Sequence, residues 1–501
     1  MNALLSLPIV LPLIGAAVSI LGGRSRRVQR TAGLAVLTVN VGLAVALLVD
    51  VDRNGPRATQ GGGWPAPLGI TLVADRLAAL LLVVATSMLL AVLVYAIGQP
   101  GAERNHVGFT SVYLVLAAGV SAAFLTGDLF NLFVAIEMML TASYVLITLG
   151  GRLDQVRAGM TYVVISLLAS TLFMAVLAYV YAATGTVNLA DLSVRIPELP
   201  AGTRAALAVA MLVVFGIKAA LVPLHFWLPD AYPTAPSPVT AVFAGLLTKV
   251  GIYAIVRTQT LLFGPGGVPT GLLLGAAALT MVVGMVGAVA EHDVRRILSF
   301  SIVGQVGYMV VGIALFDLAG LTAVVLSLVH HIVVKTALFL TGGLIEHHGG
   351  ATRLERLGGM ARTAPVIGVL FLVPALALCG VPPLSGFAAK FSLFAATVAR
   401  GEWWVLAVMV LVGVLTLVAM MKIWVQVFWA PPSERPVRQP ERAVWNAAPP
   451  LMVAPTVVLV VAVVAIGVFA GPLAGLAERA AGELLDPAAY RAVVAGTGSA
   501  P

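Results

Sequence analysis

Residues 215–257 read FGIKAALVPLHFWLPDAYPTAPSPVTAVFAGLLTKVGIYAIVR. This stretch contains two apolar segments, and each carries one lysine, Lys218 or Lys249. Pro223 follows Lys218 by five positions, and a proline in a helix interior removes a backbone hydrogen bond and clashes with the preceding turn. Such irregular backbone is tolerated at membrane depth only where protein or a water-filled cavity surrounds it. The stretch therefore predicts a broken helix with a charge beside the break.

The whole chain has the composition of an integral membrane protein. Of its 501 residues, 60% are hydrophobic and 10% are charged, with a mean hydropathy of +1.04, whereas soluble domains are about 25% charged. The net charge of +8 is spread among short loops, which argues against a nucleic-acid partner. The single cysteine, Cys379, excludes an internal disulfide framework and a Cys-rich metal or iron–sulfur site. We expect no cofactor and no resident metal.

Fourteen apolar segments approach or exceed the length that crosses a bilayer, which is about 20 residues. They are residues 2–22, 31–49, 77–97, 108–126, 129–149, 159–183, 205–224, 237–257, 270–290, 297–315, 319–345, 365–397, 403–429 and 448–470. The first has no basic residue ahead of its apolar run and no clear cleavage site, so we expect a retained helix and not a signal peptide. The predicted fold is an all-α polytopic membrane protein with about fourteen transmembrane helices.

The twelfth segment repeats the features of the seventh. It contains LCGVPPLSGFAAKF, in which Lys390 follows Pro383 by seven positions. Broken helices five positions apart suggest two five-helix units, and because five is odd, the second unit enters the membrane from the opposite side. Many transporters have this inverted repeat, with ion sites beside the broken helices. The predicted domains are residues 1–107 (helices one to three), 108–257 (first repeat), 270–429 (second repeat) and 448–501 (C-terminal helix and tail).

The arginines predict the orientation of the chain. All 24 fall in loops or at helix edges, and the loops after odd-numbered helices carry 15 of them. Because positively charged loops stay in the cytoplasm, we expect a cell-membrane protein with both termini outside. The cytoplasmic set includes Arg24, Arg26, Arg27, Arg30, Arg353, Arg356 and Arg362.

The five lysines all lie inside apolar segments, and Glu137 is the one acid in mid-span. Ionisable groups at membrane depth mark functional sites by default, and a buried lysine, unlike arginine, can gain and lose a proton. This pattern indicates proton movement. Glu137 lies in NLFVAIEMMLTASYVL, and we interpret Lys218 as its partner, because opposite charges a few ångströms apart favour each other's charged forms. A neutral, hydrogen-bonded carboxylic acid is the alternative.

Lys335 follows His331 by four residues in VHHIVVKTALFL, so the two share a helix face while His330 points elsewhere. A histidine pair with a lysine in one intramembrane segment favours a proton path over simple packing. Lys390 mirrors Lys218. For Lys422, which lies among Trp424 and Trp429, we favour a snorkelling interfacial side chain that is compatible with a cation–π contact.

Five further polar residues have less definite interpretations. The role of His225, beside Pro223, is left open. His347 and His348 are expected to be solvated, and Arg295 and Arg296 are expected to anchor a helix start.

Three motifs, FGIKAALVPLHFWLPDAYPTAPSPVTAVFAGLLTKVGIYAIVR, DVRRILSFSIVGQVGYM and GVPPLSGFAAKF, resemble the antiporter-like membrane subunits shared by respiratory complex I, membrane hydrogenases and Mrp-type Na+/H+ antiporters. Within this superfamily the chain is most similar to the D-type subunits of multi-subunit Mrp antiporters. The resemblance implies fourteen helices with outside termini and a coupled pair of Glu137 and Lys218. It also implies a connection along the membrane through Lys249, His330, His331 and Lys335, which ends at Lys390.

Our first hypothesis is a proton-translocating subunit of a hetero-oligomeric antiporter for Na+ or another monovalent cation, with other antiporter subunits, H+ and the lipid bilayer as partners. The alternative is a proton-pumping membrane subunit of a complex I-type NADH:quinone oxidoreductase or a membrane-bound hydrogenase. Some complex I relatives carry glutamate at the position of Lys390, so this lysine argues against that subtype. A structural subunit that transports nothing is a third possibility. In the first hypothesis the chain is a transporter subunit and not an enzyme.

Overall fold

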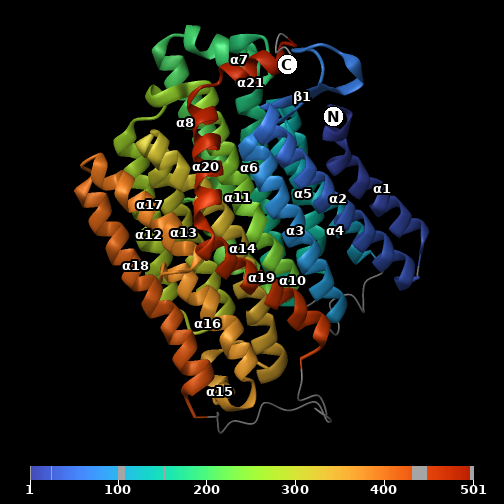
Figure 1. The fold of residues 1–501 in the computed structure, drawn as a ribbon, viewed down its shortest axis with the longest axis vertical. Coiled ribbons are helices and arrows are strands. Elements are labelled where there is room, and N and C mark those ends of the chain that lie inside the picture. Colours follow the sequence, from blue (N-terminus) through green and yellow to red (C-terminus); the bar gives the residue numbers. More distant parts are fainter. Residues whose placement is uncertain are drawn as a thin grey trace.

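The computed structural model describes residues 2–23, 25–99, 108–149, 151, 153–431 and 448–496, so Arg24 lies outside the described residues. The chain is a bundle of long helices (Figure 1), which confirms the predicted all-α membrane fold. Twelve described helices are long and apolar enough to cross a membrane, and three shorter apolar helices accompany them. All fourteen predicted segments correspond to these helices, because the twelfth is divided into two short ones.

The N-terminal part contains three long helices and a two-stranded sheet that we did not predict. The elements are α1 (Leu7–Leu21), α2 (Arg26–Asn54), β1 (Arg57–Gln60), β2 (Thr71–Ala74) and α3 (Arg76–Gly98). The strands pair antiparallel between α2 and α3. Asp75 caps α3 by accepting a hydrogen bond from the Ala78 backbone N–H, which satisfies one of the free amides at the helix start.

The first predicted repeat begins with α4 and ends in a continuous helical stretch. Its elements are α4 (Phe109–Leu125), α5 (Leu129–Thr148), α6 (Leu153–Thr184), α7 (Leu189–Arg195), α8 (Ala201–Ala219), α9 (Trp227–Ala231), α10 (Ser237–Val242), the π-helix η5 (Phe243–Leu247), α11 (Thr248–Thr258) and the π-helix η6 (Gln259–Phe263). The predicted seventh helix ends five residues early, at Ala219, because Ala220 adopts a left-handed conformation. The predicted break before Pro223 is therefore present.

The second predicted repeat and the C-terminal part complete the bundle. Their elements are α12 (Thr270–Ala290), α13 (Val294–Leu315), α14 (Leu318–Gly349), α15 (Met360–Thr363), α16 (Pro365–Cys379), α17 (Ser385–Ala399), α18 (Trp403–Trp424), the π-helix η9 (Val425–Trp429), α19 (Pro450–Val468), α20 (Ala470–Leu485) and α21 (Ala488–Val494). The second break lies between α16 and α17, where Gly380 has a positive φ. The segment predicted as a tail contains two further helices, α20 and α21.

Burial separates an inner group of helices from an outer group. The apolar windows of α14 and of the α10–η6 stretch are wholly buried, whereas only about a third of those of α1, α6, α18 and α19 is buried. Polar groups on the inner helices are therefore shielded by protein, and the outer helices present apolar side chains outward. Both ends of the chain lie at the same end of the bundle (Figure 1), as an even number of crossings requires.

Candidate functional site

Glu137 and Lys218 meet at a hydroxyl group. Glu137 lies on α5, Lys218 lies in the last turn of α8, and Ser170 of α6 lies between them. The Ser170 hydroxyl proton is shared between the Glu137 carboxylate and the Ser166 carbonyl, which is 2.9 Å away, and the hydroxyl accepts a hydrogen bond from Lys218 Nζ at 3.3 Å. Lys218 Nζ also donates to the backbone oxygen of Ser166, at 3.2 Å. The predicted pair is brought together, but through an intervening serine that sequence reasoning missed.

The break after α8 favours a cation at Lys218. The C-terminal end of a helix carries partial negative charge from its unsatisfied carbonyl groups, and Lys218 lies one residue before the end of α8. Trp227 Nε1 donates to the carbonyl of Ile217 at 2.9 Å and holds the broken end. Gly251 of α11 packs against the backbone at Ala219, where a Cβ atom would lie 2.7 Å from the Ala219 nitrogen. This close approach places α11 directly against the end of α8.

Lys249 lies at the start of α11, just after the π-helical turn η5. Its side chain is fully buried, and Nζ donates to the carbonyl of Ala244 at 2.6 Å and to the Thr248 hydroxyl at 3.3 Å. π-Helical turns often occur at functional sites, because they re-aim the side chains that follow. The preceding turn also contacts α14, where Gly245 leaves room for the Thr336 side chain.

The predicted histidine and lysine group lies on α14 with all three side chains buried. The rings of His330 and His331 are 4.7 Å apart, and His330 Nδ1 shares a hydrogen bond with the Ser385 hydroxyl at 2.8 Å. Lys335 Nζ donates to the Ser301 hydroxyl of α13 at 2.6 Å. Lys335 and His330 therefore contact two different neighbouring helices.

Lys390 lies on α17 beside the second break. Its Nζ donates to the carbonyl of Cys379, the last residue of α16, at 3.3 Å and lies 5.1 Å from the centre of the Tyr308 ring. Lys218 and Lys390 thus each lie next to the end of a helix at a break, as predicted. Ion pairs between described residues all use arginine as the cation. Within this described part of the chain, hydroxyl and carbonyl oxygens hold the buried Lys249 and Lys335 and the partly buried Lys390.

Two basic residues have partners that were not predicted. Lys422 donates to the carbonyls of Val289 and Glu291 at 2.9 and 2.7 Å, so it caps the end of α12. Arg257 is not at a helix edge, because the helical stretch continues through η6. It is buried and pairs with Asp75 at 2.6 Å, and this carboxylate makes a buried guanidinium tolerable.

The structure also describes the surroundings of three histidines outside the predicted path. His225, whose role was left open, has a buried ring beside Phe226. Its Nδ1 has no hydrogen-bond partner among the described residues. His348 shares a hydrogen bond with Thr363 at 3.2 Å and is only partly solvated, whereas His347 is exposed as expected.

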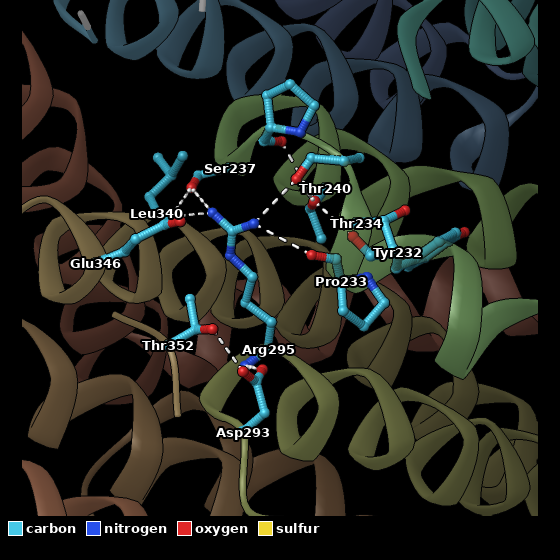
Figure 2. A network of polar contacts seen from close by, with 12 residues as sticks. Tyr232, Pro233, Thr234, Ser237, Thr240, Asp293, Arg295, Leu340, Glu346 and Thr352 are labelled. Atoms are coloured by element: carbon cyan, nitrogen blue, oxygen red, sulfur yellow. Dashed lines mark hydrogen bonds and ion pairs between the residues drawn. The ribbon is translucent and has the colours of Figure 1, made fainter. Parts of the chain in front are cut away.

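Arg295 anchors the loops at the end of the bundle opposite the termini. Figure 2 shows its guanidinium between the Ser237 and Glu346 side chains and the Pro233 carbonyl. It donates to that carbonyl at 3.2 Å and to Ser237 at 2.6 Å, and it pairs with Glu346. These contacts confirm the expected anchoring role. A polar cavity of about 490 Å³ lies beside this network, bounded by the loops after α9, α12 and α14.

The predicted residues lie on a series of helices in which each helix packs against the next. The contacts run from α5 to α6, from α6 to α8, from α8 to α11, from η5 (which leads into α11) to α14, and from α14 to α17. Each of these α-helices except α6 contributes a predicted ionisable residue, and α6 contributes Ser170. The predicted ionisable residues therefore lie on one series of packed helices within a membrane bundle, an arrangement typical of a transport protein.

Comparison with known proteins identifies its family. A family model described as "NADH:quinone oxidoreductase/Mrp antiporter, TM" matches residues 126–416, and the chain belongs to this family. It is 42% identical to the D-type subunit of the Na+/H+ antiporter of Alkalihalophilus pseudofirmus, over 98% of this chain and 99% of that protein.

Two solved structures have the same fold. A chain of the Mrp complex from Dietzia sp. DQ12-45-1b is 34% identical, with a TM-score of 0.91 over 99% of this chain and all of that one. A chain of an archaeal membrane-bound sulfane sulfur reductase is 26% identical, with a TM-score of 0.89 over 99% of this chain and 100% of that one. The resemblance seen in the sequence motifs is confirmed.

Proposed function

We propose that this chain is the proton-translocating subunit of a multi-subunit antiporter that exchanges Na+ or another monovalent cation for protons. The names of the relatives, a Na+/H+ antiporter subunit of the D type and a chain of an Mrp complex, support the antiporter assignment. The observation that carries the proposal is the continuous row of packed helices, in which buried lysines are held by neutral oxygens. Keeping every lysine of the row protonated would cost free energy, because neutral oxygens do not compensate several buried positive charges.

Proton transfer in this proposal is electrostatic and stepwise. A proton that reaches Glu137 neutralises the carboxylate and loosens its hold, through Ser170, on the Lys218 ammonium. The resulting change of charge at Lys218 alters the energy of a proton on Lys249, because charges interact strongly across packed helices of low dielectric constant. The same effect passes to the His330, His331 and Lys335 group and then to Lys390.

We further propose that the chain resides in the cell membrane with both termini outside. The excess of arginine in the loops after odd-numbered helices supports this orientation. A C-terminal alkaline phosphatase fusion is then active, because this enzyme works only outside the cytoplasm. A fusion that is inactive although the protein is inserted would reverse the orientation.

The functional test uses vesicles that contain the assembled complex. Replacing Glu137 or Lys218 by alanine is expected to abolish Na+-dependent proton movement, because either change removes one end of the first charged pair. Glu478→Ala is the matched control, since this exposed carboxylate on α20 lies outside the row. Near-normal exchange in both test variants, at normal assembly, would show that the pair does not carry protons.

A further inference from the structure

Helix α13 carries a stripe of polar side chains, none of which belongs to the predicted proton path. Ser301, Gln305 and Tyr308 are separated by four and three residues, so they lie on one face of the helix. All three are buried, in the middle of a helix that is otherwise apolar along most of its length. The stripe spans about 10 Å along the axis. It belongs to the motif DVRRILSFSIVGQVGYM, to which the sequence assigned only an anchoring role.

One end of the stripe contacts Lys335 and the other contacts Lys390. Ser301 accepts the hydrogen bond of Lys335 Nζ at 2.6 Å, and the Tyr308 ring lies under Lys390 Nζ at 5.1 Å. The Tyr308 hydroxyl donates to the Met409 carbonyl at 2.5 Å, so its own proton is already engaged. Tyr308 is thus a positioning residue that holds Lys390 at the end of the stripe.

Gln305 lies between these ends with an unused acceptor. Its Nε2 donates to the Thr416 hydroxyl of α18 at 3.4 Å, and Thr416 donates its own proton to Val412 at 2.7 Å. Thr416 can therefore only accept from Gln305, which assigns the orientation of the amide. Gln305 Oε1 is left buried with no hydrogen-bond partner among the described residues. A buried amide oxygen without a partner can accept a hydrogen bond from a water molecule.

His330 approaches α17 at Ser385 and Gly386. Ser385 and Lys390 are five residues apart, about 140° around the helix, whereas Gly386, which His330 Cε1 faces, lies four residues before Lys390. The stripe, by contrast, contacts both lysines through α13, which packs against α14, α17 and α18.

We propose that Ser301 and Gln305 form a hydrated branch through which protons pass between Lys335 and Lys390. Lys335 Nζ gives a proton to Ser301 Oγ, and the Ser301 hydroxyl releases its own proton, which is donated to the Leu298 carbonyl at 2.7 Å in the structure, to water held by Gln305 Oε1. That water in turn passes a proton to Lys390 Nζ. The reverse movement uses the same groups, and no bond other than those to the transferred protons changes. This inference rests on the proposed proton-translocating function and names the groups that carry its last step.

The test compares three substitutions in vesicles that contain the assembled complex. Gln305→Leu keeps the size but removes the acceptor, and it is expected to lower Na+-dependent proton movement by about tenfold or more. Gln305→Glu keeps an oxygen that holds water, so it should recover most of the rate while changing its pH dependence. Gln259→Leu removes another buried glutamine amide, whose Nε2 donates to the Ala208 carbonyl away from the row, and should transport normally.

The outcomes separate the branch from the proposed function. Normal transport in Gln305→Leu, together with loss of transport in Lys335→Ala and Lys390→Ala, would overturn the branch alone. Normal transport in the two lysine variants would overturn the proposed function itself. Equal loss in Gln305→Leu and Gln305→Glu, with an unchanged pH profile, would show that Gln305 acts only in packing and would also overturn the branch.

Discussion

The first charged pair depends on a serine at the scale of single residues. The Ser170 hydroxyl forms hydrogen bonds with both Glu137 and Lys218. It lies on α6, a helix that carries none of the predicted ionisable residues. A hydroxyl can donate to one group while accepting from another, so it can pass a proton without acquiring a charge. The link between carboxylate and ammonium is therefore carried by a neutral side chain.

Replacing Ser170 by alanine should slow Na+-dependent proton movement in vesicles by about tenfold or more, because a positioned proton-transfer group is lost. Ser170→Thr keeps the hydroxyl and should retain most of the rate. The neighbouring Thr171 is exposed and donates to its own helix, at the Leu167 carbonyl, so Thr171→Ala is the control. Equal rates in Ser170→Ala and the control would contradict a role for this hydroxyl.

At the scale of elements, the close contact between α12 and α13 places the polar stripe. Gly284 of α12 faces Gly304 of α13, and a Cβ atom on Gly284 would lie 2.2 Å from the Gly304 nitrogen. Small residues let helix backbones approach closely in membranes. Gly304 is adjacent to Gln305, so this contact fixes the position of the stripe relative to α12.

Gly284→Ala should lower the free energy of unfolding by about 1–3 kcal/mol, since the added methyl group forces the two helices apart. Gly275→Ala on the same helix is the matched control, because nothing described lies within 4 Å of a Cβ atom there. Thermal unfolding of the purified complex in detergent measures the difference. Indistinguishable midpoints for the two variants would contradict the close contact.

At the scale of the whole molecule, a buried ion pair joins the C-terminal helices to the centre of the bundle. Arg257, where α11 continues into η6, pairs with Asp75 just before α3, and its guanidinium lies 5.3 Å from the centres of the Tyr253 and Tyr490 rings. Burial raises the pKa of the Tyr490 phenol, so α21 presents a neutral ring to this cation. Glu483 of α20 pairs with Arg76 nearby.

Breaking the pair should destabilise the whole chain. Arg257→Met and Asp75→Asn are each expected to cost about 3–5 kcal/mol, because each leaves an unpaired partner buried. The double variant should cost less than the sum of the two, and a double-mutant cycle on thermal unfolding measures this coupling. Additive losses would show that the two side chains do not stabilise each other.

Most of the architecture could be predicted because hydropathy is a local property. A bilayer crossing requires a continuous apolar run, so the spans and the intramembrane lysines follow from short stretches of sequence. The breaks near Pro223 and Pro383 were predictable for a similar reason, since proline disrupts the helix that contains it. The two C-terminal helices were not, because α20 carries charged residues and its position depends on contacts with α3 and α14.

The chemistry of the row depends instead on partners that are distant in sequence. Small hydroxyl side chains are common in membrane helices, where many bond only their own backbone, so nothing local distinguishes Ser170, Ser301 and Ser385. Arg257 was predicted to lie at a helix edge, because the sequence around it contains no acid to neutralise a buried guanidinium. Its partner, Asp75, lies 182 residues away. Sequence thus established which ionisable groups are buried, since burial follows from the apolar run around each one. Only helix packing determined which oxygens hold them, because a hydrogen bond requires two atoms from separate helices to meet within about 3 Å.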